Sequence, residues 1–228
     1  MRIPFILAGL VMFAITARAQ KFEKGYVIKA NGDSIAGFIE KPNAKLTPST
    51  IQFKSTEAGN TQTFTPKDIK KFKYDSNKAY FVSATLKLDL TTQDPEKLSR
   101  IAIESRDVRT DAVFLELVQD GRLKLYKYLY GDEYVYYIIE DQAGVFTGME
   151  NAHVYVERSN GFSGVGVSTT NVKIIPVYKD QLELMFTECV TKADIRKLSY
   201  TESAFKKFLV NFQVCRYGDD VKKLIVAY

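Results

Sequence analysis

The chain has 228 residues, 46% of them hydrophobic, and 32 Lys and Arg against 27 Asp and Glu give a formal net charge of +5. Acidic and basic residues are interspersed, which excludes the strongly basic face typical of nucleic-acid-binding proteins. The densest basic run, Lys70-Lys71-Phe72-Lys73, is short and is expected to be a solvated face. The length suffices for one domain of ordinary size or two small ones, with a buried core.

Residues 1–19 have the three regions of a cleavable secretory signal peptide: a positive start, an apolar stretch over residues 3–15, and small residues before the cleavage site. The sequence therefore predicts cleavage between Ala19 and Gln20 and an exported protein, either periplasmic or extracellular. No second apolar stretch reaches the roughly 20 residues needed to cross a bilayer, so no membrane span is predicted after cleavage.

Over residues 20–177 apolar and polar residues alternate with the period of two that is typical of β-strands. The Asn31-Gly32 pair is a strong hairpin signal, because both residues tolerate the positive φ of a tight turn. Further strands are predicted around Gly59-Asn60 and Asp120-Gly121, and over residues 133–140 and 153–157. The expected fold class is α+β, with an antiparallel, sandwich-like or barrel-like part that is rich in hairpins.

The clearest strand spans Tyr80 to Leu90. Its alternate residues, starting with Tyr80, are apolar, whereas Ser, Thr, Lys and Asp occupy positions between them, which predicts one core face and one wet face. Residues 91–100, which include Asp94-Pro95, are the best linker and a candidate boundary between two β-rich halves.

After Pro176 the period changes from two to 3.6, which predicts two packed helices over residues 178–217, followed by a tail at 218–228. A capping box headed by Ser199 is expected to start the second helix. Each helix carries one apolar stripe: Leu182, Met185, Phe186 and Cys189 in the first, and Phe205, Phe208, Leu209, Phe212 and Cys215 in the second.

Cys189 and Cys215 are the only two cysteines of the chain. Because exported proteins mature in an oxidising compartment, we expect a disulfide between them, with both sulfurs on core-facing sides of the helices. The alternative is two buried free thiols. In the loop-entropy model, closing a loop of this size stabilises the fold by roughly 3.5 kcal/mol.

No catalytic or metal-binding pattern is recognisable. The chain contains one histidine, His153, in a predicted strand, and one histidine makes neither a metal cluster nor a triad. The Gly161–Gly166 segment matches neither a dinucleotide fingerprint nor a P-loop, because no lysine and no strand-helix unit accompany it. We therefore predict no catalytic residue, no metal and no cofactor, and a protein that is not an enzyme.

Carboxylate pairs leave one enzymatic alternative, a secreted hydrolase, because a glycosidase needs only two acids at a suitable distance. Nothing in the sequence selects among the candidates, which are Glu104, Asp107, Asp111, Asp132 with Glu133, and Glu140 with Asp141. A pocket with two acids about 5 to 10 Å apart would favour this alternative.

The most unusual stretch is rich in tyrosine. Tyr126, Tyr128 and Tyr130 are predicted to share one strand face with Lys124, while Leu123, Leu125 and Leu129 point to the other face. Amphipathic rings suit contact with sugars and proteins, so these three tyrosines are the candidate contact surface for a partner protein or glycan. Alternatively, they cover the second face of a sheet because tyrosine has a high β propensity.

Several segments carry a family resemblance: Gly25-Tyr26-Val27-Ile28, Asn31-Gly32-Asp33-Ser34-Ile35, Gly37-Phe38-Ile39, Ile51-Gln52-Phe53, Phe64-Thr65-Pro66 with Asp68, Ile69 and Phe72, Asp120-Gly121 with Leu125-Tyr126, and the helical tail with both cysteines. In these segments the chain resembles an uncharacterised family of signal-peptide-bearing envelope proteins from Bacteroidota. The resemblance implies export in a Gram-negative cell and supplies no catalytic residues. The leading hypothesis is a non-catalytic envelope protein that binds a partner protein or a glycan through its β-rich part.

Overall fold

The computed structural model describes residues 22–41, 45–76, 79–101, 105–131, 134–158 and 169–227. The predicted signal peptide and its cleavage site at Ala19 and Gln20 lie outside the described residues. None of the helices in these ranges combines the length and the apolar character that a membrane crossing requires.

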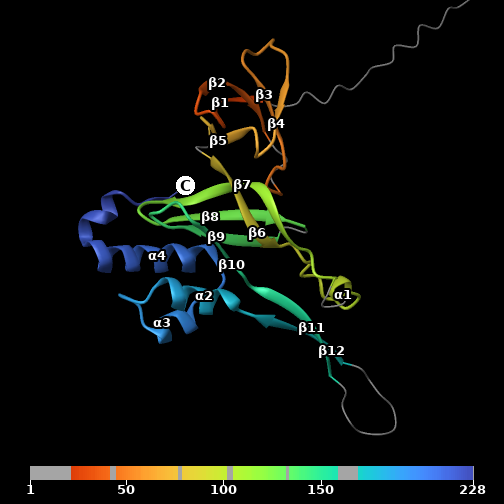
Figure 1. Cartoon of the computed structure of the whole chain (residues 1–228), viewed down its shortest axis with the longest axis vertical. Helices are drawn as coiled ribbons and strands as arrows, with labels where there is room; N and C mark the ends of the chain where they lie inside the picture. Colours follow the sequence, from red (N-terminus) through yellow and green to blue (C-terminus); the bar gives the residue numbers. More distant parts are fainter. Residues whose placement is uncertain are drawn as a thin grey trace, which may run out of the picture.

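Most strands belong to one antiparallel sheet with the order β10-β9-β8-β7-β6-β5-β1-β2-β3-β4 (Figure 1). A separate two-stranded ribbon projects from the rest of the protein and pairs β11 with β12. The expected α+β class with an antiparallel β-rich part is therefore confirmed. The strand bounds are β1 (Phe22–Lys29), β2 (Ser34–Glu40), β3 (Ile51–Lys54), β4 (Gln62–Phe64), β5 (Ile69–Tyr74), β6 (Tyr80–Asp89), β7 (Val108–Asp120), β8 (Lys124–Tyr130), β9 (Tyr134–Glu140), β10 (Phe146–Met149), β11 (Ala152–Arg158) and β12 (Thr169–Ile175).

The hairpin between β1 and β2 turns at Asn31-Gly32, as the sequence predicted. Gly32 has a φ of +98°, which glycine adopts without a steric penalty, and the Asn31 side chain accepts a hydrogen bond from the Asp33 amide at 3.1 Å. The turn places β1 and β2 in register, with Tyr26 opposite Ala36. The predicted hairpin at Asn31-Gly32 is confirmed.

The C-terminal part contains three helices among its described residues, α2 (Val177–Met185), α3 (Lys192–Lys197) and α4 (Glu202–Tyr217), rather than the two that were predicted. The segment after α2 breaks the expected stripe, because Phe186 and Cys189 follow the end of that helix. A capping box of Thr191 and Asp194 starts α3. The cap of α4 is Thr201, not Ser199, and its hydroxyl accepts from the Ala204 amide at 3.3 Å.

Two shorter elements complete the described chain. Helix α1 (Pro95–Leu98) follows β6 and is capped by Asp94, whose side chain accepts from the amides of its first turn. In the predicted tail at 218–228, a 3-10 helix (Asp219–Lys223) leads to β13 (Val226–Ala227), which pairs with β7.

Strands β6 to β10 curl so that β10 lies beside β6, and the concave side of this curled sheet encloses an apolar core that we call the inner core. The alternation predicted for residues 80–90 is confirmed, because every second residue from Tyr80 packs into it. Its buried members are Val82, Ala84, Leu86, Leu88, Val113, Leu115, Leu117, Tyr126, Tyr130, Tyr136 and Ile138.

The helices cover the convex side of β8 and β9 (Figure 1). Leu125 and Ile139 of the sheet pack in one cluster with Leu182 and Leu209 of the helices. A buried amide fixes α4 against the β7–β8 turn: the Gln213 side chain accepts from the Leu123 amide at 3.0 Å and donates to the Leu209 carbonyl at 3.2 Å. Because both buried polar atoms are satisfied, this contact costs no unpaired hydrogen-bonding group.

A third core joins strands β1 to β5 to the convex side of β6 and β7. The Phe72 ring stacks on Phe81 with centroids 4.5 Å apart and meets Phe114 edge-on at 4.9 Å. Since β6 and β7 pair along Phe81–Asp89, residues 91–100 connect neighbouring strands inside one sheet. The boundary between two β-rich halves that the sequence suggested there stays a prediction.

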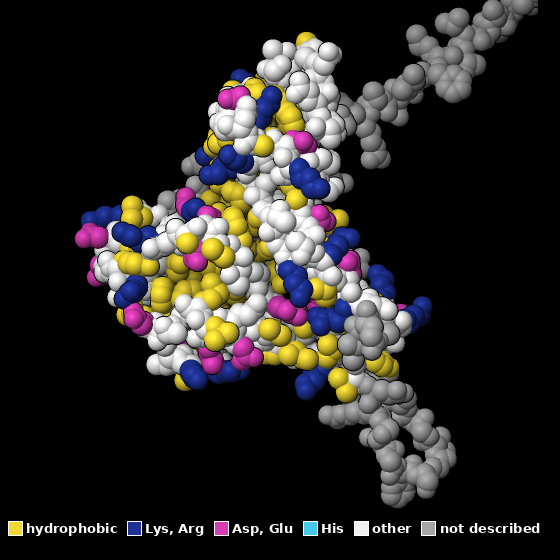
Figure 2. All heavy atoms as spheres, viewed as in Figure 1, with side chains coloured by type: hydrophobic (Ala, Val, Ile, Leu, Met, Phe, Trp, Pro, Cys, Tyr) yellow, Lys and Arg dark blue, Asp and Glu magenta, His cyan; other side chains and the backbone are white. Residues whose placement is uncertain are grey.

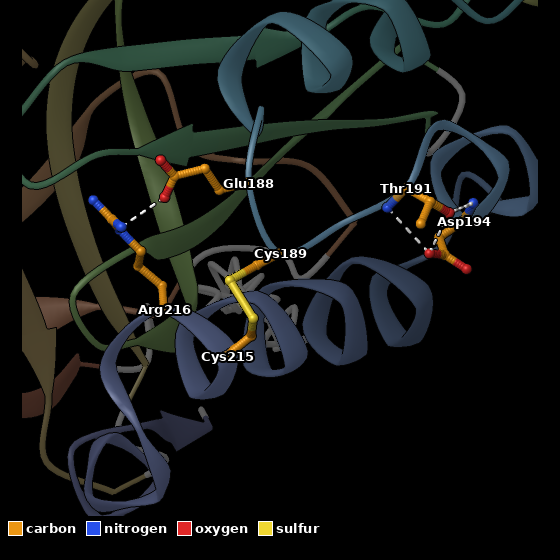
Figure 3. Close-up of a disulfide and its surroundings, with 6 residues drawn as sticks. All are labelled: Glu188, Cys189, Thr191, Asp194, Cys215 and Arg216. Atoms are coloured by element: carbon orange, nitrogen blue, oxygen red, sulfur yellow. Dashed lines mark hydrogen bonds and ion pairs between the residues drawn. A yellow bond between two sulfur atoms is a disulfide. The ribbon is translucent and has the colours of Figure 1, made fainter.

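Cys189 and Cys215 form the predicted disulfide, with their Cα atoms 5.8 Å apart (Figure 3). It ties the segment that follows α2 to the last turns of α4. Both cysteines are exposed, so the expectation that their sulfurs project from core-facing sides is wrong. An ion pair between Glu188 and Arg216, at 2.6 Å, lies beside the disulfide.

Because neither cysteine is part of a core, replacing both by serine tests the covalent link without creating a cavity. We expect the Cys189→Ser/Cys215→Ser variant to lose about 3.5 kcal/mol of unfolding free energy, the value of the loop-entropy model. Denaturant unfolding followed by circular dichroism measures this loss. Reducing the disulfide of the parent protein should shift its unfolding midpoint toward that of the variant, and the variant should not respond to reductant. Equal midpoints for oxidised parent and variant would contradict the stabilising role.

Candidate functional site

The inner core has two ends, and both are polar. One end is formed where β6, β8 and β10 begin and β7 and β9 finish, and it carries a cavity of about 320 Å³. We call it the mouth cavity. Its principal lining residues are Lys70 and Lys71 of β5, Tyr80 of β6, Asp120 of β7, Lys124 and Tyr126 of β8, Glu140 of β9 and Phe146 of β10.

The carboxylate of Glu140 is held from two sides at the bottom of the mouth cavity. The Tyr126 hydroxyl donates to it at 2.5 Å, and the Lys124 ammonium lies 3.3 Å from the same oxygen. Burial raises the pKa of Tyr126 far above its usual range, and the hydrogen bond to Glu140 adds to the rise. The phenol therefore remains a donor at any physiological pH.

Aromatic rings and lysines form the rest of the lining. Tyr126 meets Phe146 with ring centroids 5.6 Å apart, and the Lys71 ammonium lies 5.8 Å from the centroid of the Tyr80 ring. The hydrogen bond to Tyr80 raises the pKa of Lys71, against the opposing effect of its partial burial. Lys71 thus carries a full positive charge next to an aromatic ring.

The three tyrosines predicted to form a contact surface face the inner core. Tyr126 is 1% exposed and Tyr130 is 9% exposed, while Tyr128 is partly buried and stacks on Tyr130 with ring centroids 6.2 Å apart. The predicted alternation is correct, because Leu123 and Leu125 point toward the helices. The three tyrosines do not form one open contact surface, because Tyr126 lines the mouth cavity and Tyr130 lies at the other end of the inner core.

At that other end, a charged cluster closes the inner core. The Arg106 guanidinium binds the carboxylates of Asp89 and Glu150, the latter at 3.3 Å. The adjacent cavity measures about 10 Å³, which accommodates a single water molecule. Tyr130 accepts a hydrogen bond from the Gln93 amide at 3.1 Å, and burial raises its pKa to about 12.

His153 lies beside this closed end. Its Nδ1 atom is 3.1 Å from the Asn151 carbonyl oxygen, and burial lowers the pKa of the imidazole. Within the described ranges, no group of three or more His, Cys, Asp and Glu side chains is arranged to hold a metal ion.

Of the described carboxylates that the sequence offered as catalytic candidates, only Glu140 lines the mouth cavity. Asp107 lies 3.7 Å from Arg109, and Asp111 accepts from the amide of Ala112. Asp141 accepts hydrogen bonds from the amides of a turn and does not line the mouth cavity, whereas its neighbour Glu140 does. The remaining candidates, Glu104, Asp132 and Glu133, and the Gly161–Gly166 segment lie outside the described residues.

Sequence reasoning missed the two carboxylates that do converge, Asp89 and Glu150. They lie far apart in the chain and meet only because β6 and β10 become neighbours when the sheet curls. No local motif could have signalled this contact.

Fold and site together define an α+β protein with a curled antiparallel sheet that carries a cavity at one end of its inner core, and with a disulfide in its helical part. Comparisons with protein-family models, with curated proteins and with solved structures found no match for this chain.

The bond between Tyr126 and Glu140 can be tested by removing one oxygen atom. We expect Tyr126→Phe to lower the unfolding free energy by about 1.5 to 3 kcal/mol, because a buried hydrogen bond to a charged group is lost. Tyr128→Phe is the matched control on the same strand face and should change it by less than about 0.5 kcal/mol. Denaturant unfolding of both variants decides the matter, and equal losses would mean that the Tyr126 hydroxyl contributes nothing specific.

The single histidine, His153, allows a direct test of whether side chains at the closed end are buried. Because the pKa of His153 is lower in the folded state than the ordinary 6.5, the unfolded chain takes up a proton at a pH where the folded protein does not. Stability should therefore fall as the pH drops below about 6.5, and the fall should end below the folded-state pKa. A His153→Gln variant should lack this component. Nuclear magnetic resonance titration of the imidazole should give a midpoint below 6.5, and a midpoint above it would refute the burial of this ring.

Proposed function

We propose that the protein is an exported, non-catalytic envelope protein that binds a glycan or a segment of a partner protein in the mouth cavity. The observation that carries this proposal is the cavity itself, which combines aromatic rings with charged groups at the end of an otherwise filled core. Its volume of about 320 Å³ is at the lower limit of ordinary ligand pockets, which run from roughly 300 to 1,000 Å³.

Two features support export. The chain begins with a predicted signal peptide, and the described part contains a disulfide between Cys189 and Cys215. Disulfides persist mainly in the periplasm and outside the cell, where thiols are oxidised. Envelope glycans and envelope proteins are the ligands that such a compartment offers.

The lining of the mouth cavity matches the chemistry of a sugar or of a polar peptide. Partly buried rings of Tyr80 and Phe146 offer apolar faces, while Lys124 and Glu140 offer polar groups that fix orientation. A cavity of this size admits one or two sugar rings, or one or two side chains of a partner.

The arrangement of acids supports binding more than hydrolysis. In the mouth cavity, Glu140 is already bound by Tyr126 and Lys124, and Asp120 accepts from the Gly121 amide at 2.9 Å. At the closed end, Asp89 and Glu150 share Arg106 beside a space for one water molecule, so a sugar could not reach both. A glycosidase needs two acids that flank a bound substrate.

The proposal predicts that aromatic side chains matter at one end of the inner core only. Tyr80 and Tyr134 are both partly buried tyrosines that pack on the inner core, but Tyr80 lines the mouth cavity and Tyr134 lies toward the closed end. We expect Tyr80→Ala to weaken binding about tenfold, since an aromatic contact is worth about 1 to 1.5 kcal/mol. Tyr134→Ala should leave affinity within about twofold.

The measurement is binding of the purified protein, without its signal peptide, to arrays of bacterial glycans and of peptides from envelope proteins. Unfolding curves confirm that both variants remain folded. If the two alanine variants lose binding equally, the ligand does not enter the mouth cavity. If the parent protein retains nothing on either array, the binding function is rejected.

A further inference from the structure

The basic run in β5 has a position that its sequence alone did not reveal. Phe72 is fully buried in the core shared with β6 and β7, while Lys70 is exposed and Lys71 is half-buried. Both lysines line the rim of the mouth cavity, and Figure 2 shows Lys and Arg side chains beside β5. The run is therefore not an independent surface patch but one wall of a pocket.

The charges in this pocket do not cancel. Its two carboxylates have partners of their own: Glu140 is bound by Lys124, and Asp120 accepts from the Gly121 amide. Within the described part of the chain, no carboxylate forms an ion pair with Lys70 or Lys71. Three lysines against two acids leave the lining of the mouth cavity with one excess positive charge.

We infer that the mouth cavity binds an acidic sugar, a hexuronate unit of a glycan, whose carboxylate contacts Lys70 and Lys71 while its ring packs against Tyr80. This inference rests on the proposed function and adds the class of ligand to it.

The other groups of the cavity fit a sugar acid better than other anions. The cationic groups of this lining are lysines, which act as point charges, rather than the arginine forks that hold a phosphate group in a bidentate way. A fatty acid has no hydroxyl groups, so it could not donate to the carboxylates of Glu140 and Asp120 that also face the cavity. A hexuronate supplies a carboxylate for the lysines, hydroxyl donors for these acids and a ring with apolar C–H edges for the tyrosine.

The first test needs no variant. Binding of the protein to tetrasaccharides of galacturonate and of glucuronate is compared with binding to the same tetrasaccharides after their carboxyl groups have been reduced to alcohols. The linkages and ring shapes stay the same, so only the charge differs. We expect at least one acidic tetrasaccharide to bind about tenfold more tightly than its reduced counterpart, and its affinity to fall as salt is added.

The second test assigns this preference to two side chains. Lys70→Gln/Lys71→Gln should bind the acidic and the reduced tetrasaccharide with equal affinity. The control Lys87→Gln/Lys173→Gln removes the same charge from exposed positions of β6 and β12 that do not line the cavity, and it should keep the preference. Glutamine at exposed or half-exposed positions preserves the fold, which unfolding curves of both variants verify.

Each outcome has one meaning. Equal binding of acidic and reduced tetrasaccharides by the parent protein overturns the inference and leaves glycan binding in the mouth cavity intact. A preference for the acid that survives in Lys70→Gln/Lys71→Gln overturns the assignment to β5. If neither form binds, the inference fails. The proposed function is then decided by whether Tyr80→Ala and Tyr134→Ala differ in their binding of other glycans and of peptides.

Discussion

The architecture depends on one constraint, the burial of both faces of the central strands. β6 and β7 direct Val82 and Val113 into the inner core, and the neighbouring Phe81 and Phe114 into the core shared with β1 to β5. β8 and β9 bury their second face under the helices instead. Because side chains alternate along a strand, a shift of one residue in register would exchange the two cores. The curl of the sheet, the position of the helices and the mouth cavity all depend on which core each strand face enters.

Local signals in the sequence were sufficient for the strands and most turns. Hairpins such as the one at Asn31-Gly32 depend on backbone preferences of two residues, and a periodicity of two depends only on the strand itself. Whether a face is wet depends on what the rest of the chain places over it. The tyrosines of β8 illustrate the difference: their alternation was predicted correctly, yet Tyr126 and Tyr130 are buried because the sheet closes over them. High β propensity, the alternative explanation of this stretch, describes them better.

The C-terminal part shows a second limit of periodicity. Apolar spacing suggested that Phe186 and Cys189 continue one helix, but the chain leaves the helix at Met185 and begins another after Thr191. Phe186 remains buried without helical geometry, since its ring lies 4.6 Å from that of Phe212. Cys189 adopts a φ of +66° and turns outward to the disulfide. Packing and a covalent bond, which no local pattern encodes, decided both positions.

The two ends of the inner core explain why a ligand site is proposed at only one of them. At the closed end, Arg106 binds both Asp89 and Glu150, and the adjacent cavity of about 10 Å³ has room for only one water molecule. At the other end, Lys124 forms an ion pair with Glu140 and Tyr126 donates a hydrogen bond to it, while β5 brings Lys70 and Lys71 in addition. With Lys124 and the acids Asp120 and Glu140, the lining carries three positive charges against two negative ones, and the apolar core beneath it supplies no counter-charge. A lining with an excess positive charge and an aromatic wall attracts an anion, which is the physical basis of the proposed hexuronate site.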